Sequence, residues 1–368
     1  MNEPVRILQI VPNMQQGGLE NFIMNIYRNI DRTKIQFDFL VHYQERKFFD
    51  DEIEKMGGRI YRFSLRDDNN ILKYIEQLNE FYKKHKEYKI IHCHMSSIGT
   101  INFLIARKNN IRIKIAHSHN SATEKSLKGI MKRLLMQPYR YVSDINFACS
   151  ESAGKYLFKN KKFEVIPNAI NTKKFMFNKE RRKEYREKLG INEKRFVIGH
   201  VGRFNVQKNH KFIIEIFNEY LKKNKRTVLL LIGDGELIEE TKLLCKKLKI
   251  EKSVIFLKNV SNVYDYYNTM DLFILPSLFE GLPVVGIEAQ TNGLNCLFSN
   301  RITDEAKLTD GVEYLDLDPK IWVEKFEQKF VEIEKDRLEN YNKISNSEFE
   351  ITKVSKIMQE KYLSFIKD

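Results

Sequence analysis

Two glutamates, Glu280 and Glu288, stand eight residues apart in the segment PSLFEGLPVVGIEAQ and offer the clearest chemistry in this sequence. An apolar run, Leu272–Leu275, precedes them, and Gly281 and Pro283 mark a turn that leads into a helix. We expect Glu280 on the loop and Glu288 within the helix. A carboxylate on such a loop can accept hydrogen bonds from sugar hydroxyls, and one on the helix can bind both hydroxyls of a ribose.

Two cations follow another apolar run, in the segment VGRFNVQKNH. Gly202 ends the run, and Arg203 and Lys208 lie in the loop after it. Cations at the carboxyl end of a strand suit a diphosphate, because they neutralise the charge that builds on a departing nucleoside diphosphate. A solvated basic loop is the alternative that these residues alone leave open.

A pair of glycines, Gly17 and Gly18, separates a predicted strand from a predicted helix in the segment VPNMQQGGLENF. Glycines at such a junction let backbone amides approach a phosphate or a sugar at the helix N-terminus. The pattern is not GxGxxG, which argues against a nicotinamide dinucleotide. A tight turn without a ligand is the competing interpretation.

Four histidines lie at the ends of two neighbouring predicted strands, as the pairs His92 and His94, and His117 and His119. Residues i and i+2 share a face of a strand, so these pairs could bind zinc. No cysteine or carboxylate nearby in the sequence completes a set of four ligands. We therefore favour one histidine that contacts substrate, with the others packed or hydrogen-bonded.

Two sets of alternating apolar and amphipathic segments position these residues. The first set predicts strands at Arg6–Val11, Phe37–Val41, Arg59–Phe63, Ile90–Cys93, Ile113–His117, Ile145–Ala148 and Phe163–Ile166, and helices such as Leu19–Asn29, Ile71–His85 and Lys128–Met136. The second set predicts strands at Phe196–Val201, Thr227–Ile232, Val254–Phe256, Leu272–Leu275 and Asn295–Phe298, and helices at His210–Lys223, Glu236–Leu248, after Pro283, at Lys320–Lys335 and at Ile351–Ile366. Between the sets, residues 167–195 read as a charged connection with a solvated helix.

Repeated strand–helix units predict an α/β protein with two Rossmann-like, doubly wound domains and a ligand cleft between them. We place these domains at residues 1–172 and 173–350. The remaining residues, 351–368, are expected to form a C-terminal helix that packs back on the first domain.

The net charge of +14 divides into +12 over residues 1–175 and +2 over residues 176–368. A basic domain attracts nucleic acid, an acidic membrane face or a phosphorylated substrate, unless its lysines only decorate the surface. No basic face with interleaved aromatics supports nucleic acid. We expect a cytoplasmic protein, which could lie on the inner face of the cell membrane. The four cysteines are widely spaced, and the sequence shows neither a signal-peptide pattern nor an apolar run of about 18 residues.

Six segments occur in order over roughly residues 5–300, namely QQGGLEN, HSHNS, PNAIN, VGRFNVQKNH, LLLIGDGEL and DLFILPSLFEGLPVVGIEAQTNGLNC. In them the chain resembles glycosyltransferase family 4, a family of retaining enzymes with the GT-B fold. The sequences of these segments are similar to those of the branch that builds capsular polysaccharides and exopolysaccharides. This resemblance implies an acceptor-side N-terminal domain and a C-terminal domain that binds a nucleotide-sugar donor.

The resemblance also implies roles for single residues, with His119 and Glu280 as catalytic residues close to the donor sugar. The implied donor site comprises Gly17, Gly18, Arg203, Lys208, Val260, Glu280, Gly281, Leu282 and Glu288. Candidates on the acceptor side are Asn120, Lys128, Lys132 and Arg133. The apolar stripe of the basic helix there could rest on an anionic leaflet or pack on its own sheet.

The implied reaction transfers a sugar from a nucleotide-sugar, most simply a UDP-sugar, to a saccharide acceptor carried on a polyprenyl diphosphate. It retains the anomeric configuration and needs neither a cofactor nor a metal, because protein cations hold the diphosphate. Two alternatives stay open, a GT-B sugar-nucleotide epimerase and a non-catalytic GT-B partner subunit. The sequence does not fix the donor sugar, the acceptor or the linkage.

Overall fold

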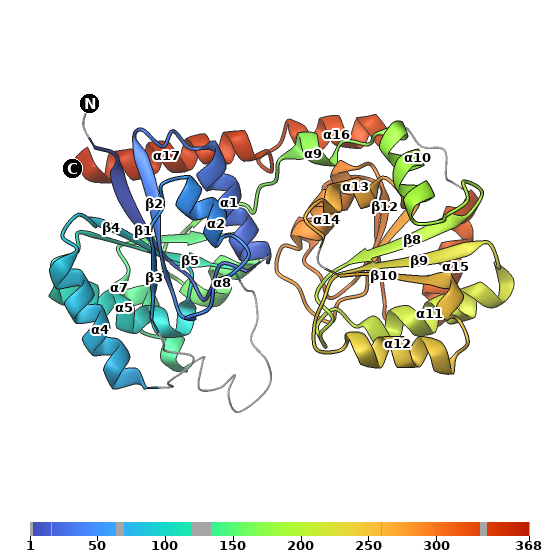
Figure 1. Ribbon diagram of the computed structural model, residues 1–368, viewed down its shortest axis with the longest axis horizontal. Coiled ribbons are helices and arrows are strands. Elements are labelled where there is room, and N and C mark those ends of the chain that lie inside the picture. The colour runs from blue at the N-terminus through green and yellow to red at the C-terminus, as the bar shows by residue number, and fades with distance from the viewer. Residues whose placement is uncertain are drawn as a thin grey trace. The chain divides into compact units, whose positions relative to one another are not determined.

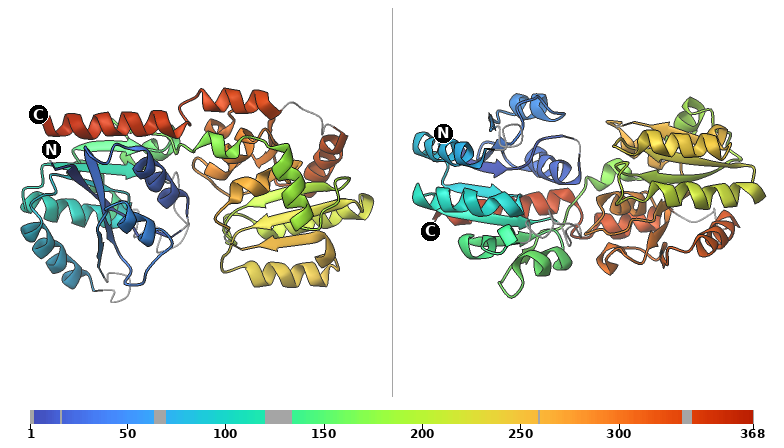
Figure 2. Two further views of the ribbon diagram at one scale, coloured as in Figure 1. Left: turned by 45° about the horizontal axis from the view of Figure 1, so that its top comes forward. Right: turned by 90° about the horizontal axis from the view of Figure 1, so that it is seen from below.

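A computed structural model of the protein describes residues 3–15, 17–63, 70–119, 134–258, 260–331 and 337–367. The chain forms two compact units (Figures 1 and 2). Unit 1 consists of Met1–Ala169 and Ile351–Asp368, and unit 2 consists of Ile170–Glu350. Each unit contains a parallel sheet, which confirms the α/β fold with two Rossmann-like, doubly wound domains. The first unit ends at Ala169, shortly before the boundary predicted after residue 172.

Unit 1 is built on a sheet of seven parallel strands, counted over its described residues, in the order β3-β2-β1-β4-β5-β6-β7. Its strands are β1 (Val5–Ile10), β2 (Ile35–Val41), β3 (Ile60–Arg62), β4 (Ile90–Cys93), β5 (Ile113–Ser118), β6 (Ile145–Ala148) and β7 (Glu164–Val165). Its helices are α1 (Gly18–Asn29), α2 (Asp50–Lys55), α4 (Ile71–Lys84), α5 (Ser96–Lys108), α7 (Tyr139–Val142), α8 (Glu151–Phe158) and α17 (Ile351–Lys367).

Helices cover both faces of this sheet (Figure 1). Alternate strand residues point to opposite faces, so Ile7 packs against α1 and α17, whereas Leu8 packs against the layer of α4, α5 and α8. α17 presents Val354, Met358 and Tyr362 to the first of these cores. The C-terminal helix is therefore an integral part of unit 1.

Unit 2 contains a sheet of six parallel strands, again counted over its described residues, in the order β10-β9-β8-β11-β12-β13. Its strands are β8 (Phe196–Val201), β9 (Thr227–Ile232), β10 (Val254–Leu257), β11 (Leu272–Leu275), β12 (Asn295–Ser299) and β13 (Val312–Leu315). Its helices are α9 (Thr172–Phe175), α10 (Lys179–Lys188), α11 (His210–Lys223), α12 (Ile238–Lys247), α13 (Val263–Tyr267), α14 (Val284–Thr291), α15 (Pro319–Val331) and α16 (Arg337–Ser345), with 3-10 turns at Glu251–Ser253 and Asp304–Ala306.

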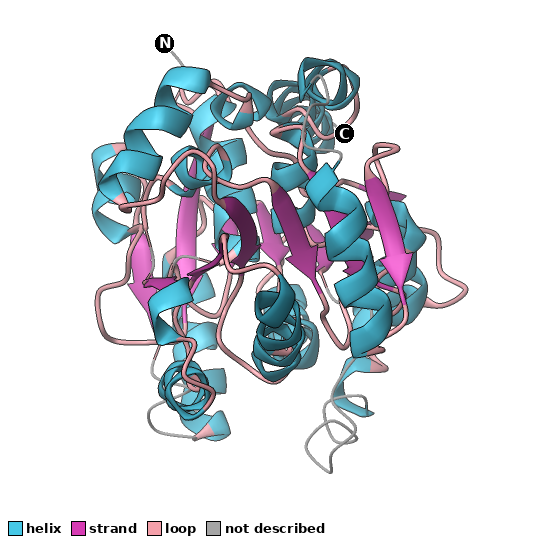
Figure 3. Ribbon diagram, turned by 90° about the vertical axis from the view of Figure 1, so that its right-hand side faces the viewer, coloured by secondary structure: helices cyan, strands magenta, loops and turns pink. Residues whose placement is uncertain are grey.

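Helices cover both faces of the sheet of unit 2 as well (Figure 3), and an apolar core lies on each side of it. α11, α12 and α15 cover one face, where Trp322 is fully buried. α9, α13, α14 and α16 cover the other face, where Tyr267 and Ile287 are buried. The strands match the continuous apolar runs of the sequence because both of their faces are buried.

Two points of the sequence prediction need correction. Residues 170–195 open unit 2 with α9 and α10 rather than forming only a connection, and α10 is not solvated throughout. Arg186 of α10 is fully buried, and its guanidinium donates to the buried carboxylate of Asp271 at 2.7 Å, which compensates its charge. The strand β13 was missed, and residues 332–335 of the helix predicted at Lys320–Lys335 lie outside the described residues. Most of the predicted helix Lys128–Met136 lies outside the described residues.

All four cysteines are buried free thiols. Within the described part of the chain, no helix is both long enough and apolar enough to cross a bilayer.

Candidate active site

The predicted site residues gather where each sheet reverses its strand order. The order reverses between β1 and β4 in unit 1 and between β8 and β11 in unit 2. Open parallel sheets bind ligands beyond the carboxyl ends of the strands at such a point. In unit 2, Arg203 and Lys208 follow β8, and Glu280 follows β11. The sheet order therefore brings together two loops that lie far apart in the sequence.

Lys208 and Glu280 form a buried ion pair between these two loops. Nζ of Lys208 lies 2.5 Å from Oε1 of Glu280, and the two side chains are 14% and 9% exposed. Nε2 of Gln207 donates to Oε2 of the same carboxylate at 3.1 Å. The N–H of Leu278 donates to the carbonyl of Gln207 at 2.8 Å, which ties the loops together through the backbone as well. Gln207 was not predicted, although it stands next to Lys208 in the QKNH motif.

Glu288 lies in α14, which begins after Pro283 as the sequence predicted. The hydroxyl of Tyr267, from α13, donates to Oε2 of Glu288 at 2.8 Å. Burial raises the pKa of Glu288 to about 7, and this hydrogen bond opposes the shift. The carboxylate is thus held in one orientation by a tyrosine that sequence analysis did not identify.

The turn GDGE supports the loop that carries Arg203. Gly233 has a φ of +148°, and a Cβ atom there would lie 2.0 Å from the carbonyl oxygen of Gly202. Only glycine permits so close an approach of the two backbones. Arg203 itself is 69% exposed and donates to Glu236 at 3.1 Å, so its guanidinium lies at the surface rather than in the Lys208–Glu280 pair.

The other predicted donor residues of unit 2 are apolar residues and a glycine. Val260 and Leu282 pack against the apolar core that contains Ile287. Gly281 joins Glu280 to Leu282 in the loop before α14.

In unit 1, Gly17 caps α1 and Gly18 is its first residue, as predicted. A Cβ atom on Gly17 would lie 2.4 Å from Oε2 of Glu20, so the carboxylate of Glu20 lies against this turn. Burial raises the pKa of Glu20 to about 7. Glu20 is a further acidic group at the turn that the sequence reasoning did not single out.

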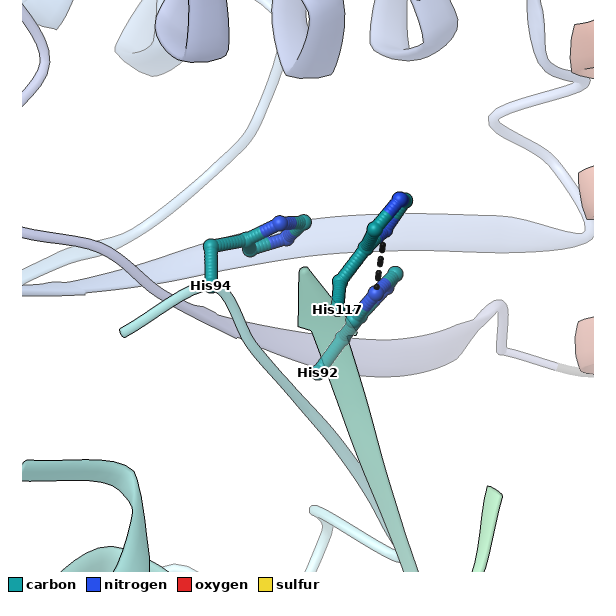
Figure 4. A group of neighbouring side chains, drawn as sticks. All are labelled: His92, His94 and His117. Atoms are coloured by element: carbon teal, nitrogen blue, oxygen red, sulfur yellow. Dashed lines mark hydrogen bonds between the residues drawn. The ribbon is translucent and has the colours of Figure 1, made fainter. Parts of the chain in front are cut away.

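The four histidines of unit 1 form hydrogen-bonded pairs at the ends of β4 and β5. Nε2 of His92 lies 3.1 Å from Nδ1 of His117 (Figure 4), and Nδ1 of His94 lies 2.8 Å from Nε2 of His119. Burial lowers the pKa of His119 to about 3 and lowers the pKa values of His92, His94 and His117 well below the usual range. All four rings are therefore uncharged at neutral pH.

The zinc alternative can be tested against this geometry. One nitrogen from each of His92, His94 and His117 lies within 4.8 Å of the others, which is compact enough for a metal ion (Figure 4). The group contains no cysteine or carboxylate, and both nitrogens of His92 and of His94 already have hydrogen-bond partners, whereas Nε2 of His117 has none among the described residues. This arrangement agrees better with hydrogen-bonded histidines than with a structural zinc site.

The remaining candidates, Asn120, Lys128, Lys132 and Arg133, lie outside the described residues.

Comparison with known proteins identifies the family. The family Glycosyltransferase Family 4 matches residues 16–174, and Glycosyl transferases group 1 matches residues 181–349. EpsF of Bacillus subtilis, which is assigned as a glycosyltransferase, is 32% identical over 82% of this chain and 80% of EpsF.

Two further relatives carry more specific names. The UDP-Gal:alpha-D-GlcNAc-diphosphoundecaprenol alpha-1,3-galactosyltransferase of Escherichia coli is 26% identical over 80% of this chain and 78% of that enzyme. The capsular polysaccharide biosynthesis glycosyltransferase CapH of Staphylococcus aureus is 27% identical over 86% of this chain and 88% of CapH.

Among solved structures, HepE of Anabaena in complex with UDP and glucose superposes with a TM-score of 0.81. The match covers 97% of this chain and 99% of HepE at 16% identity, which supports the GT-B fold and no finer property. Two family matches that together span both units, and a relative above 30% identity, leave one conclusion. This chain belongs to glycosyltransferase family 4 and is a glycosyltransferase with the GT-B fold.

Proposed function

We propose that this chain is a retaining glycosyltransferase that transfers a sugar from a UDP-sugar to a saccharide acceptor on a lipid diphosphate, in the synthesis of capsular polysaccharide or exopolysaccharide. The observation that carries the proposal is the buried Lys208–Glu280 pair at the reversal point of the unit 2 sheet, with Glu288 on the helix after it. This arrangement offers a cation for a diphosphate and two carboxylates for hydroxyl groups within one segment of the fold.

The names of relatives support the choice of donor and acceptor. The Escherichia coli relative is named for a UDP-sugar donor and an acceptor on diphosphoundecaprenol, and CapH is named for capsular polysaccharide. HepE, with the same fold, was solved with UDP and glucose. The net charge of +12 in residues 1–175 is also consistent with an acceptor that carries a diphosphate.

In the proposed reaction, the bond between the anomeric carbon and the β-phosphate oxygen breaks. The acceptor hydroxyl oxygen attacks the anomeric carbon from the same face, and its proton passes to the departing phosphate oxygen. Lys208 stabilises the negative charge that develops on the leaving diphosphate, and Arg203 adds charge at its outer side. Glu280 orients sugar hydroxyls, Glu288 accepts from the ribose and His119 contacts the sugar. No metal takes part in this scheme.

Donor turnover tests the proposal directly. Release of nucleoside diphosphate is measured from a panel of UDP-, GDP- and ADP-sugars in the presence of EDTA, for the wild type, Glu280→Ala and the surface control Glu236→Ala. We expect slow hydrolysis of one UDP-sugar that Glu280→Ala loses and Glu236→Ala keeps. Loss of turnover in EDTA would contradict the metal-free scheme, and trapping of a covalent glycosyl-enzyme would contradict attack assisted by the leaving phosphate.

The same panel separates the alternatives. A GT-B epimerase would convert the donor into its epimer without an acceptor and without release of a free sugar. A non-catalytic subunit would show neither turnover nor a thermal shift with any donor.

We also propose that the basic helix predicted around Lys128, Lys132 and Arg133 holds the enzyme on the cytoplasmic face of an anionic membrane. Next to this segment, Leu134 and Leu135 are 66% and 51% exposed, which supports an apolar contact with lipid. Flotation with anionic liposomes should weaken when Lys128, Lys132, Arg133 and Arg140 are neutralised together. Unchanged flotation would reject membrane binding through this helix.

A further inference from the structure

A buried polar network in unit 1 links the predicted catalytic histidine to the central strand and to the C-terminal helix. We call it the histidine network, and it consists of Gln9, His92, His94, His117, His119 and Tyr362.

The pleat of the sheet places this network on one face. Gln9 of β1 lies opposite His92 of β4, and both share a face of the sheet with Ile7 and Ile90, which pack in the core under α1 and α17. His117 lies two residues beyond Ile115, the partner of His92 on β5, and therefore points to the same side. Tyr362 is the point at which α17 reaches these strands.

The number of donors and acceptors on each residue determines the direction of every hydrogen bond in the network. Each of the four rings is neutral, so each carries one N–H donor and one bare nitrogen acceptor. The amide of Gln9 has one oxygen, which only accepts, and one NH₂ group, which only donates. The direction of every bond then follows from Gln9.

One branch runs from the amide oxygen of Gln9 through His94 to His119. Oε1 of Gln9 lies 2.9 Å from Nε2 of His94, so this nitrogen carries the proton and Nδ1 of His94 is bare. Nε2 of His119, at 2.8 Å from that bare nitrogen, must therefore donate to it. Nδ1 of His119 remains a bare acceptor, and it is buried without a partner among the described residues.

The other branch runs from the amide nitrogen of Gln9 through Tyr362 and His92 to His117. Nε2 of Gln9 donates to the Tyr362 hydroxyl at 3.4 Å. Among the described residues, Nδ1 of His92, at 2.6 Å, is the acceptor in reach of the hydroxyl proton, so the hydroxyl donates to it. Nε2 of His92 then carries a proton and donates to Nδ1 of His117 at 3.1 Å. Nε2 of His117 is left as an N–H donor, buried and without a partner among the described residues.

The two branches thus end in opposite roles on neighbouring rings. The rings of His117 and His119 are stacked with centroids 4.2 Å apart, and both touch Phe22 of α1. A hydroxyl group is the one common group that accepts and donates at a single atom. We propose that Gln9 and Tyr362 are positioning residues that set the tautomers of all four histidines, so that His117 and His119 bind one hydroxyl group, from the donor sugar or from a water molecule, as a matched donor and acceptor.

Reversal of the Gln9 amide does not change this result. It would turn every bond around, which makes His119 the donor and His117 the acceptor, and the two ends stay complementary. With Gln9 as placed, all four histidines carry the proton on Nε2, and with the amide reversed all four carry it on Nδ1. A uniform tautomer across four residues is therefore the signature of the network.

The sugar hydroxyl as the bound group rests on the proposed function, whereas the tautomer pattern does not. An experiment can therefore refute one of the two and leave the other standing.

The tautomers are measured by two-dimensional ¹⁵N NMR of the full chain with labelled histidine, in the absence of donor. The chain contains eight histidines, and single substitutions of the four outside the network, His42, His85, His200 and His210, assign the rest by elimination. We expect one uniform tautomer for all four network residues, and a mixed pattern or a protonated ring at pH 7 would overturn the proposal.

Conservative variants test the two positioning residues. Tyr362→Phe should disturb the tautomers of His92 and His117 and leave those of His94 and His119, whereas Gln9→Met should disturb all four. Tyr82→Phe is the matched control, because Tyr82 is a buried tyrosine of the same unit outside the network. An unchanged tautomer pattern in both Tyr362→Phe and Gln9→Met would also overturn the proposal.

A panel of deoxy analogues of the accepted donor distinguishes the two sources of the hydroxyl. If the sugar supplies it, one deoxy position lowers kcat/KM about tenfold in the wild type, and Tyr362→Phe loses this preference. If a water molecule supplies it, the wild type and Tyr362→Phe rank the analogues alike, although the wild type shows the uniform tautomer. A wild type that turns over no donor but shows the uniform tautomer would refute the proposed function and keep the network.

Discussion

The Lys208–Glu280 pair is the ion pair of the candidate site in unit 2, and Glu280→Gln should reveal how much it stabilises the fold. Breaking a buried ion pair by removing one partner costs about 3–5 kcal/mol, because the other charge is left uncompensated. Lys208 is 14% exposed, and a glutamine at position 280 can still accept a hydrogen bond, so we expect about 2–3 kcal/mol. For a domain of this size that corresponds to a fall of about 4–12 °C in Tm.

The double variant Glu280→Gln/Lys208→Met separates stability from catalysis. Replacement of both charges of a buried pair is often neutral, so this variant should recover most of the lost Tm. Its release of nucleoside diphosphate should nevertheless stay at least about 100-fold below the wild type, because a preorganised charge at the leaving group contributes about 2.7–4 kcal/mol. The measurements are thermal unfolding by calorimetry and donor turnover on the same preparations.

The exposed pair Arg203–Glu236 provides the matched control. These side chains are 69% and 55% exposed, so Glu236→Gln should leave the Tm essentially unchanged. If the double variant is as unstable as Glu280→Gln, the cost arises from lost packing or hydrogen bonding and not from an uncompensated lysine. If Glu280→Gln costs nothing, the pair is not buried as described.

Three further predictions concern the same unit. The pKa of Glu288 is about 7 in the folded state and 4.5 ordinarily, so the stabilisation from its protonated carboxyl is fully present below pH 4.5 and is lost as pH rises through 7. Glu288→Gln should therefore have a higher Tm than the wild type at pH 8 but not at pH 4.5. Equal dependence of Tm on pH in calorimetry would contradict the raised pKa. Tyr267→Phe removes the hydroxyl that orients Glu288. Because one hydrogen bond is worth about 1 kcal/mol, this variant should bind UDP about 5- to 10-fold more weakly in titration calorimetry, with little change in Tm. Undiminished affinity would show that UDP binding does not depend on the orientation of Glu288. Gly233→Ala places a Cβ atom 2.0 Å from a backbone oxygen, whereas the site of Gly190, which also has a positive φ, is open. Gly233→Ala should therefore lower the Tm far more than Gly190→Ala. Equal losses of Tm would mean that the positive φ alone destabilises both variants.

The strands and the site loops were predictable for the same physical reason. A parallel strand buried on both faces leaves an uninterrupted apolar run, such as Thr227–Ile232, and the polar residues that follow it must lie at the carboxyl edge of the sheet. Lys208, Glu280 and His119 were predicted to lie at this edge because they follow such runs, and the structure places each of them after a strand. β13 was missed because its sequence, VEYL, mixes polar and apolar residues, and it is an edge strand of its sheet.

The partners of these residues could not be found in the same way, because they come from tertiary structure. Tyr362 meets His92 across 270 residues of chain, and Gln207 meets Glu280 across 73. The sequence of an amphipathic helix does not show whether a tyrosine on it contributes a hydrogen bond from its hydroxyl or only packing from its ring. Only the strand order, which places β1 beside β4 and β5, shows that Gln9 can direct two histidine pairs at once. Candidate residues at strand ends can therefore be located from one sequence, whereas the residues that form hydrogen bonds with them become visible only when the packing is known.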